Sequence, residues 1–336
     1  MQPTSAHAHM DPFASLIGES PALLSVIEMA RRLEHSAATV TLTGETGVGK
    51  EVFARAIHAL REAAGSPFVA VNCGALMASL AESELFGYEK GAFSGADARG
   101  KPGKIELARG GTLFLDEIGE MSPDLQAKLL RILEDREYYP VGGTRTLRSD
   151  CRFIAATNRD LAMLVEQGKF REDLYYRLTV IELEIPPLRH RAEDIPLLAA
   201  AFAERFGCAM PIDGELRSLL TLHPWSGNVR ELRNAIERLC VLSADGALRA
   251  ELLPPAVLRS TAQRKPPFSE THNDQSHSLP AQGALSDWLA IYERRFIESA
   301  LKETEGNKQA AAHLLGISRM TLYKRINALF GTDPKN

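Results

Sequence analysis

The sequence is poor in cysteine and has no long apolar run. Its four cysteines, Cys73, Cys151, Cys208 and Cys240, are widely spaced and form no Cys-x-x-Cys pair. This spacing excludes a disulfide scaffold, argues against a zinc site and fits a reducing, cytoplasmic compartment. No apolar segment approaches the roughly 20 residues of a membrane helix. Residues 1–11 also lack the apolar core of a signal peptide, so we expect no membrane partner.

The chain also has few aromatic residues and no large excess of charge of one sign. Aromatic residues make up 7% of the chain, and 39 basic against 43 acidic residues leave a net charge of −4. That balance excludes a uniformly basic nucleic-acid coat protein, although it permits a local basic face. The 336 residues are 45% hydrophobic and 24% charged. These values are typical of soluble globular proteins and exclude wholesale disorder, and the length allows two domains.

Strand-like and helix-like segments alternate over the first half of the chain. Five short apolar segments predict strands: Val40–Thr43, Phe68–Asn72, Thr112–Leu115, Phe153–Thr157 and Val180–Ile185. Helical patterns separate most of them, which predicts an α/β subdomain with a parallel sheet over residues 16–187. Helical patterns alone follow over residues 188–258 and predict a helical lid.

The two ends of the chain have a different character. Residues 1–15 predict a disordered tail. Residues 259–283 are polar, contain three prolines and predict a flexible linker. The helical pattern returns at Leu285, so we expect a small all-α domain over residues 284–331.

A glycine-rich loop follows the first predicted strand. Residues 44–50 read Gly-Glu-Thr-Gly-Val-Gly-Lys, fit the pattern G-x-x-x-x-G-K, and precede a predicted helix over residues 51–60. The glycines let successive backbone N–H groups surround phosphate oxygens, and Lys50 adds positive charge at the β and γ phosphates. We expect ATP to bind along the whole loop. The candidate nucleotide-binding residues are Gly44, Glu45, Thr46, Gly47, Val48, Gly49, Lys50 and Glu51.

Two carboxylates end the third predicted strand. In the loop, Glu51 stands where the general pattern has a serine or threonine that ligates Mg²⁺. The ion must then be held mainly by nucleotide, water and another acid, and Asp116 is the candidate. Its neighbour Glu117 can polarise the attacking water. About seventy residues after a phosphate loop, this pair predicts an ATPase.

A further glycine-rich segment carries one aromatic residue at its tip. Taken alone it reads as a surface hairpin; its central residues are Gly91, Ala92, Phe93, Ser94, Gly95 and Ala96. It resembles the GAFTGA loop of bacterial enhancer-binding proteins, the AAA+ activators of sigma-54 RNA polymerase. The resemblance implies that this loop touches sigma-54 when the nucleotide state changes. Ser94 lacks one methyl group of the usual threonine, worth about 0.8 kcal/mol if buried, so we expect the contact to survive in a weaker form.

The resemblance covers residues 16–330 and assigns further roles. It implies that Asn72 restrains Glu117 and that Asn158 senses the γ-phosphate. The segment from residue 170 to 178 resembles the family's FRxDLYYRL, which makes Arg171 and Arg177 act across a subunit boundary. Arg230, in a segment similar to WPGNVREL, would contact nucleotide from the lid. Sites shared between subunits imply a homo-oligomer, from dimer to hexameric ring.

The last segment has the pattern of a helix–turn–helix. Asn307 and Ser318 can cap its two helices, and Gly316 can form the turn. The segment resembles the Fis-type module that ends many enhancer-binding proteins and reads palindromic double-stranded DNA as a dimer. Candidate DNA contacts are Lys308, Ser318, Arg319, Thr321, Tyr323, Lys324 and Arg325.

These features predict a DNA-binding transcriptional activator that couples ATP hydrolysis to remodelling of sigma-54 RNA polymerase. The alternative is an AAA+ DNA-binding regulator that acts without sigma-54; an AAA+ chaperone or helicase-like motor fits the C-terminal module less well. About 15 residues precede the ATPase subdomain, too few for a sensory domain. We therefore expect control by a partner protein in trans or by abundance, unless the sequence is a fragment.

Overall fold

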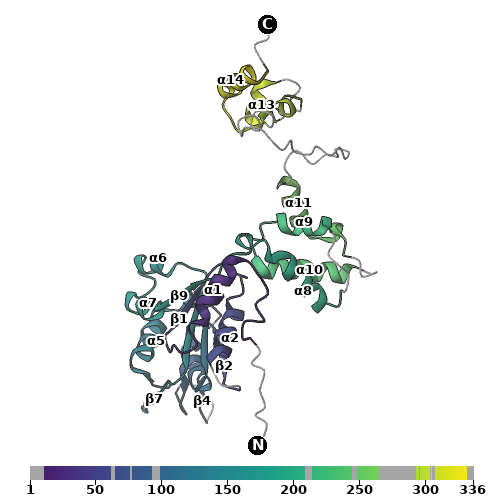
Figure 1. Cartoon of the computed structure of the whole chain (residues 1–336). Coiled ribbons are helices and arrows are strands. Elements are labelled where there is room, and N and C mark those ends of the chain that lie inside the picture. Colours follow the sequence, from purple (N-terminus) through teal and green to yellow (C-terminus); the bar gives the residue numbers. More distant parts are fainter. Residues whose placement is uncertain are drawn as a thin grey trace, which may run out of the picture. The chain divides into compact units, whose positions relative to one another are not determined.

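The computed structural model describes residues 11–61, 65–75, 78–92, 99–208, 214–243, 248–264, 293–294, 296–302, 304 and 307–330. The chain divides into two compact units, Met1–Pro267 and Phe268–Asn336 (Figure 1). Across the described ranges, every helix is too short or too polar to cross a lipid bilayer.

The first unit contains a five-stranded parallel sheet. The strands lie in the order β2-β5-β8-β1-β9, and every neighbouring pair is parallel. They are β1 (Val40–Thr43), β2 (Phe68–Asn72), β5 (Thr112–Asp116), β8 (Arg152–Thr157) and β9 (Ile181–Glu184). The predicted α/β class is confirmed, and each predicted strand is found within one residue of its expected ends. Apolar segments of this kind predict well because central parallel strands are buried on both faces.

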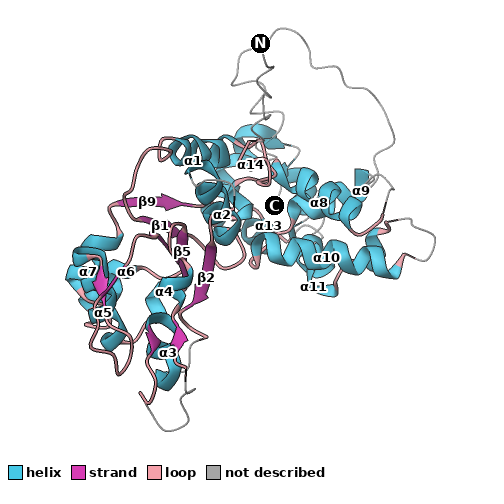
Figure 2. Ribbon diagram, turned by 90° about the horizontal axis from the view of Figure 1, so that it is seen from below, coloured by secondary structure: helices cyan, strands magenta, loops and turns pink. Residues whose placement is uncertain are grey.

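Helices cover both faces of the sheet, as Figure 2 shows. Alternate side chains of β5 divide between two cores, because Phe114 packs on one face while Leu113 and Leu115 pack on the other. The Phe114 face carries α1 (Pro21–Arg31) and α2 (Lys50–Arg61). The opposite face carries α3 (Ala78–Phe86), α4 (Lys104–Leu107), α5 (Pro123–Asp135), α6 (Leu161–Glu166) and α7 (Glu172–Leu178).

Two short hairpins pack together near one end of this unit. Strand β3 (Gly87–Tyr88) pairs with β4 (Lys101–Pro102), and β6 (Glu137–Tyr138) pairs with β7 (Leu147–Arg148). Figure 1 shows β4 and β7 at the same end of the sheet. The Glu89 N–H, next to β3, donates to the Val141 carbonyl between β6 and β7, so the two hairpins are in contact.

A helical subdomain with its own core follows the sheet. Its elements are η2 (Leu188–His190), α8 (Asp194–Arg205), α9 (Gly214–Leu222), α10 (Asn228–Leu242), η3 (Ala250–Leu252) and α11 (Pro255–Arg264). Trp225 is fully buried there, and its indole Nε1 donates to the Leu220 carbonyl at 2.7 Å. Helix α11 continues six residues beyond the expected boundary at residue 258. Proline at the first helical position favours its start, and the next prolines come only at residues 266 and 267. Residues 265–283 of the expected linker lie outside the described residues.

Residues 11–15 differ from the disordered tail that the sequence predicts. Phe13 is buried with 3% of its surface exposed, and the Arg31 guanidinium lies 5.0 Å from its ring centroid. The Arg31 Nη2 also donates to Asp11 Oδ2 at 2.7 Å, which lowers the pKa of Asp11. A single aromatic anchor has no periodicity, so the sequence pattern could not reveal it. Residues 1–10 lie outside the described residues.

The second unit packs its described helices around a small core. Helices α13 (Lys308–Leu314) and α14 (Arg319–Phe330) are joined at Gly316, whose φ is +65°. The buried side chains are Ile297, Ala300, Ala311, Ala312 and Leu322. The predicted helix–turn–helix is therefore present, and the alanines allow the close approach of its helices.

We expect Phe13→Ala to lower the free energy of unfolding by about 3 kcal/mol, because the change removes a buried aromatic ring from the core. Urea unfolding followed by circular dichroism measures this loss. Leu24→Ala is the control, since Leu24 lies on α1 with 48% of its surface exposed and should lose much less. Equal losses in both variants would show that Phe13 does not anchor the segment.

Candidate active site

The glycine-rich loop connects β1 to the start of α2. Gly44, Gly47 and Gly49 have φ values of +142°, +81° and +108°, a region that favours glycine. A Cβ atom on Gly47 would collide with the carbonyl oxygen of Gly227, whereas one on Gly49 would meet no atom within 4 Å. Gly47 therefore permits contact with the lid, while Gly49 is required only by its backbone conformation. Such a loop at a helix N-terminus fits a nucleotide's phosphates.

The Lys50 ammonium lies inside this loop. Its Nζ donates to the carbonyl oxygens of Gly44 at 2.7 Å and Glu45 at 3.1 Å. Burial lowers the pKa of Lys50, while the negative charges of Asp116 and Glu117 act in the opposite direction. The structure thus brings the predicted lysine and the predicted acidic pair into one electrostatic site.

The acidic pair occupies the carboxyl end of β5. Burial is the main cause that raises the pKa of Asp116, and its Oδ1 accepts a hydrogen bond from the Glu117 N–H at 3.0 Å. Glu117 has φ +54° and ψ +43°, which is uncommon for a residue other than glycine. This conformation lies directly before η1 (Ile118–Glu120), where the strand ends and the chain turns.

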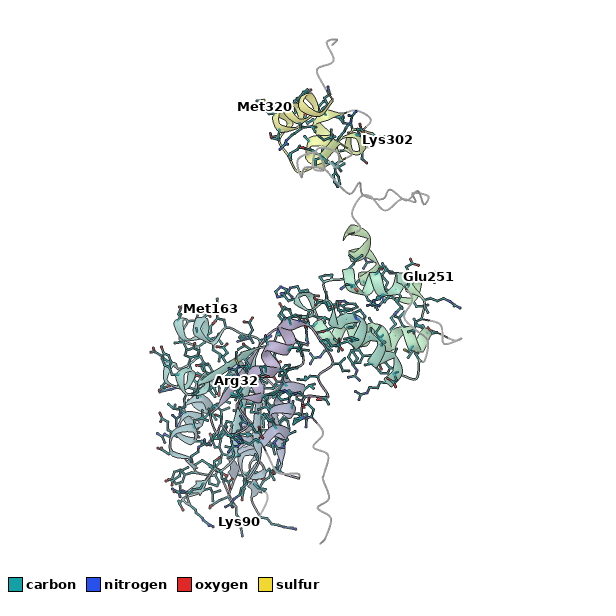
Figure 3. All side chains as sticks on the ribbon, viewed as in Figure 1. Arg32, Lys90, Met163, Glu251, Lys302 and Met320 are labelled. Atoms are coloured by element: carbon teal, nitrogen blue, oxygen red, sulfur yellow. The ribbon has the colours of Figure 1, made fainter. Side chains whose placement is uncertain are left out.

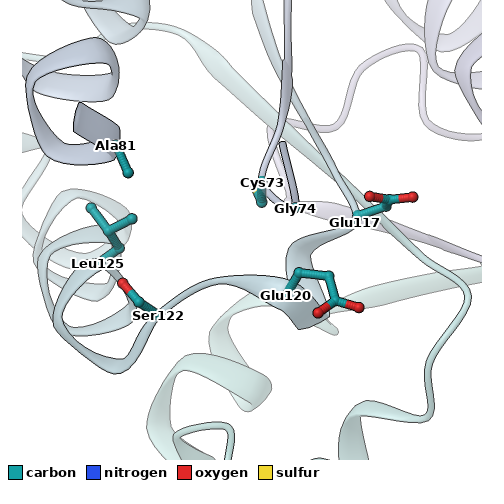
Figure 4. A pocket seen from close by; sticks show the side chains of 7 residues that line it. All are labelled: Cys73, Gly74, Ala81, Glu117, Glu120, Ser122 and Leu125. Atoms are coloured by element: carbon teal, nitrogen blue, oxygen red, sulfur yellow. The ribbon is translucent and has the colours of Figure 1, made fainter. Parts of the chain in front are cut away.

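Glu117 also borders a cavity of about 280 Å³. Figure 4 shows Glu117 and Glu120 on one side of this cavity and Ala81 and Leu125 on the other. Burial raises the pKa of the lining Cys73 thiol to about 12, with Asp116 and Glu117 contributing. The thiol is therefore protonated at neutral pH and is a poor nucleophile.

Asn72 lies beside the acidic pair, since it pairs in register with Asp116 across β2 and β5. Its Oδ1 accepts a hydrogen bond from the Ala75 N–H at 2.8 Å. A Cβ atom on Gly74 would lie 2.7 Å from Glu117 Oε2 and 3.4 Å from Asn72 Oδ1, so both side chains surround Gly74. Within the described ranges no hydrogen bond joins Asn72 to Glu117, and the restraint of Glu117 by Asn72 stays a prediction.

Asn158 reaches the phosphate loop from the end of β8. Its Nδ2 donates to the Thr46 hydroxyl at 3.0 Å. Strand β8 lies between β1 and β5 in the sheet, so Asn158 comes between the phosphate loop and the acidic pair. The role of Asn158 as a sensor of the γ-phosphate stays a prediction.

The lid meets the loop at the first turn of α10. The Arg230 N–H donates to the Gly47 carbonyl at 3.3 Å, and the Arg230 charge contributes to lowering the pKa of Lys50. Two residues to which the sequence assigned no role also meet the loop here, because Arg189 and Asn228 both bind Glu45. The sequence carried no signal for Arg189. Asn228 lies in the lid segment that resembles WPGNVREL, but its partner is 183 residues away.

The two predicted trans-acting arginines bind elsewhere in their own chain. Arg171 forms two hydrogen bonds to the Asp173 carboxylate, at 3.0 and 2.7 Å. Arg177 donates through Nε and Nη2 to the Leu133 carbonyl at 3.2 and 3.0 Å. Arg171 directly precedes α7, Arg177 lies near its end, and both are exposed. Each is thus held by residues outside the phosphate loop of its own subunit.

The base of the aromatic loop is held by the neighbouring hairpin. The Glu89 N–H donates to the Val141 carbonyl at 3.1 Å, and the Val141 N–H donates to the Gly87 carbonyl at 2.9 Å. A Cβ atom on Gly142 would lie 2.8 Å from that of Ala92. Figure 3 labels Lys90 at this extremity of the first unit. Gly91 and Ala92 are described, while the predicted sigma-54 contacts Phe93, Ser94, Gly95 and Ala96 lie outside the described residues.

Both predicted caps of the helix–turn–helix are formed. The Asn307 side chain accepts from the N–H groups of Gln309 and Ala310, and the Ser318 Oγ accepts from the Thr321 N–H at 3.1 Å. The exposed candidates for DNA contact are Lys308, Ser318, Arg319, Thr321, Lys324 and Arg325.

Two contacts orient the basic side chains of this module. Lys308 and Arg319 lie 5.1 and 5.7 Å from the centroid of the Tyr323 ring. A hydrogen bond from Arg319 lowers the pKa of Tyr323, and the charges of Lys308 and Arg319 add to this effect. Arg325 pairs with Glu293 at 3.1 Å. Lys308 and Arg319 therefore form one basic surface around Tyr323, whereas the charge of Arg325 is compensated by Glu293.

Comparison with protein families matches three segments of the chain. Residues 16–184 match the sigma-54 interaction domain, residues 189–270 match the AAA+ ATPase lid domain, and residues 289–329 match the Fis family of bacterial regulatory proteins. Together these matches cover both units.

Relatives along the whole chain agree with these matches. The chain is 44% identical over 324 residues to the regulatory protein AtoC of Escherichia coli (strain K12), covering 95% of this chain and 68% of AtoC. It is 44% identical over 336 residues to the DNA-binding transcriptional regulator NtrC of Rhizobium meliloti, covering 94% and 69%. The crystal structure of NtrX from Brucella abortus in complex with ATP superimposes with a TM-score of 0.65 at 32% identity, covering 95% of this chain and 70% of NtrX.

We expect Gly47→Ala to weaken nucleotide binding at least tenfold, because its Cβ would collide with the Gly227 carbonyl and separate lid from loop. Titration with a fluorescent ATP analogue measures the affinity. Gly65→Ala is the matched control: its φ is +93°, but its Cβ would meet no atom within 4 Å, so backbone strain is similar without a collision. Equal affinities in the two variants would show that the lid contact is not needed for binding.

Proposed function

This chain belongs to the sigma-54-dependent activators, AAA+ ATPases with a Fis-type DNA-binding module, and we propose that it uses ATP hydrolysis to remodel sigma-54 RNA polymerase so that a promoter opens. The supporting observation is the convergence of Lys50, Asp116 and Glu117 with Asn158 at one edge of the sheet. These residues lie at a strand end, directly after one, or at the start of the helix that follows the phosphate loop, so the fold positions all of them at once.

The residues of the site divide the work of hydrolysis. Lys50 would bind the β and γ phosphates, and Asn158 would report whether a γ-phosphate is present. Asp116 would hold Mg²⁺ together with nucleotide oxygens and water, and the ion would neutralise charge on the transferring phosphoryl group. Glu117 would orient the attacking water, with Asn72 restraining it, and Arg230 would contact nucleotide from the lid.

We propose active sites shared between subunits, which the position of the two arginines outside their own phosphate loop supports. Arg171 and Arg177 would approach the nucleotide of a neighbouring subunit, where a guanidinium stabilises the charge of the transition state. A closed ring would complete every site in this way, and we propose a hexamer. Because a bacterial RNA polymerase transcribes DNA in the cytoplasm, we place the assembly there.

We propose the same division of labour along the chain that the sequence predicts. Residues 16–187 form the ATPase subdomain and residues 188–258 begin the lid, which α11 extends. Residues 284–331 bind double-stranded DNA, and the Phe93–Ser94 loop contacts sigma-54. The base of that loop rests on the hairpin that contains Val141, so a rigid support stands behind the contact.

The direct test is open-complex formation on a sigma-54 promoter with purified polymerase, this protein and ATP. We expect heparin-resistant complexes with ATP and none with a non-hydrolysable analogue, because promoter opening uses the energy of hydrolysis. Phe93→Ala should abolish the complexes and leave ATPase activity unchanged. A protein that hydrolyses ATP and binds DNA but forms no complexes would contradict the proposal and support a regulator without sigma-54. Ser94→Thr would then be the first variant to examine.

Mixing two inactive variants tests whether the arginines act in trans. Arg171→Ala keeps Glu117, and Glu117→Gln keeps Arg171, so a mixed ring contains some sites with both groups. We expect each variant alone to lose at least 90% of steady-state ATPase activity, because a tenfold drop in rate corresponds to about 1.4 kcal/mol of lost transition-state stabilisation. The mixture should recover part of this activity. Arg148→Ala is the control, because Arg148 is an exposed arginine paired with Glu137 and its loss should leave activity unchanged. An inactive mixture would contradict sharing of the site.

A further inference from the structure

The phosphate-loop residue Glu45 is bound by two residues of the lid. Arg189 Nη1 donates to Glu45 Oε2 at 2.8 Å, and Arg189 Nη2 donates to Oε1 at 2.6 Å. Asn228 Nδ2 donates to Oε2 at 3.1 Å. These bonds to the ionised form lower the pKa of Glu45 to about 2, so the carboxylate keeps its charge throughout the physiological pH range.

Asn228 connects three parts of the molecule through one side chain. Its Oδ1 accepts from the Leu188 N–H at 2.8 Å, where the sheet subdomain ends and the lid begins. Its Nδ2 donates to Glu45 and to the Thr46 carbonyl, each at 3.1 Å. The residue is fully buried and has φ +54°, a conformation that asparagine and aspartate tolerate better than other side chains. The amide oxygen of Asn228 therefore accepts one hydrogen bond from the start of the lid, and the amide nitrogen donates two to the phosphate loop.

The position of Arg230 depends on the same turn of helix. Asn228 is the first residue of α10, and Arg230 follows two residues later, with its N–H donating to the Gly47 carbonyl. The carbonyl of Gly227, directly before α10, approaches Gly47 so closely that a Cβ atom would collide. The start of α10 is therefore held against the phosphate loop by backbone contacts and by the Asn228 side chain.

We propose that Glu45, Arg189 and Asn228 form a latch that positions the first turn of α10, and with it Arg230, on the phosphate loop. The three are positioning residues, since they act through Arg230 and the loop backbone. The latch holds the lid over bound nucleotide in the ground state and in the transition state alike. Its loss should therefore raise KM for ATP and leave kcat nearly unchanged. This inference rests on the proposed ATPase function of the site.

An exchange of donors and acceptors tests the latch more sharply than truncation does. Asn228→Asp keeps the size of the side chain and its tolerance of positive φ. It also places a carboxylate oxygen opposite Glu45 Oε2 and the Thr46 carbonyl, where the amide donates in the wild type. The repulsion should open the latch. Glu45→Gln returns a donor to the position that faces this new carboxylate, although it removes the ion pair with Arg189.

The experiment measures steady-state ATPase activity against ATP concentration for the full chain and three variants, N228D, E45Q and the double variant. We expect KM to rise at least tenfold in N228D and a few-fold in E45Q. The double variant should have a lower KM than N228D alone, because the new donor relieves the repulsion. Glu137→Gln is the matched control: it neutralises an exposed glutamate paired with an arginine away from the loop, and its KM should equal that of the wild type.

Three outcomes would overturn the latch. The first is a KM in N228D equal to that of the wild type. The second is a KM in the double variant raised by the product of the factors in the two single variants, and the third is a loss confined to kcat. If N228D fails to fold by circular dichroism, Arg189→Ala decides, since Arg189 is 41% exposed and tolerates truncation. Its KM should rise several-fold, and an unchanged KM would contradict the latch. A wild-type protein without ATPase activity would instead contradict the proposed function.

Discussion

Close backbone contact between Gly47 and Gly227 is the constraint on which the rest of the site depends. The contact leaves no room for a side chain on Gly47, because a Cβ there would collide with the Gly227 carbonyl oxygen, and Gly227 itself has no room for one because a Cβ would lie 2.8 Å from the Glu231 Cβ of its own helix. Phosphate loop and lid therefore meet as backbone against backbone. Only then can the Asn228 amide reach Glu45 and the Arg230 N–H reach Gly47.

Positive and negative side chains lie close together at this junction and offset one another's charge. Lys50 lies among Asp116, Glu117 and Arg230, and burial disfavours its charged form. The two carboxylates offset that cost, and they in turn need a cation because Asp116 is itself partly buried. The phosphates of a nucleotide bring further negative charge, which explains why two cationic side chains face one loop. Glu45 contributes no charge to this balance, since Arg189 neutralises it at the surface.

Local patterns in the sequence predicted most of the fold and much of the site. Strands β1 and β5 could be placed because each is a short apolar segment followed by chemically distinctive residues. The caps at Asn307 and Ser318 could be placed because a cap depends on residues at most three positions away. Arg189 and Asn228 could not, because their partner Glu45 lies 144 and 183 residues away and long-range polar contacts of this kind leave no periodic signal. Phe13 was missed for a similar reason, because the burial of a single ring depends on the tertiary packing around it and leaves no pattern in the sequence.

Two helices connect the surroundings of Glu117 with the base of the aromatic loop. The cavity beside Glu117 is lined by Ala81 of α3 and Leu125 of α5. Helix α3 runs from this cavity directly into β3, the start of the aromatic loop, and α5 runs from it into β6, the hairpin that supports the loop. Both helices are packed into one continuous apolar core with β5. A packed core transmits displacement because it has few voids to absorb it. Two helices of one packed core therefore lead from the surroundings of Glu117 to the loop base, where Val141 forms hydrogen bonds with Gly87 and Glu89.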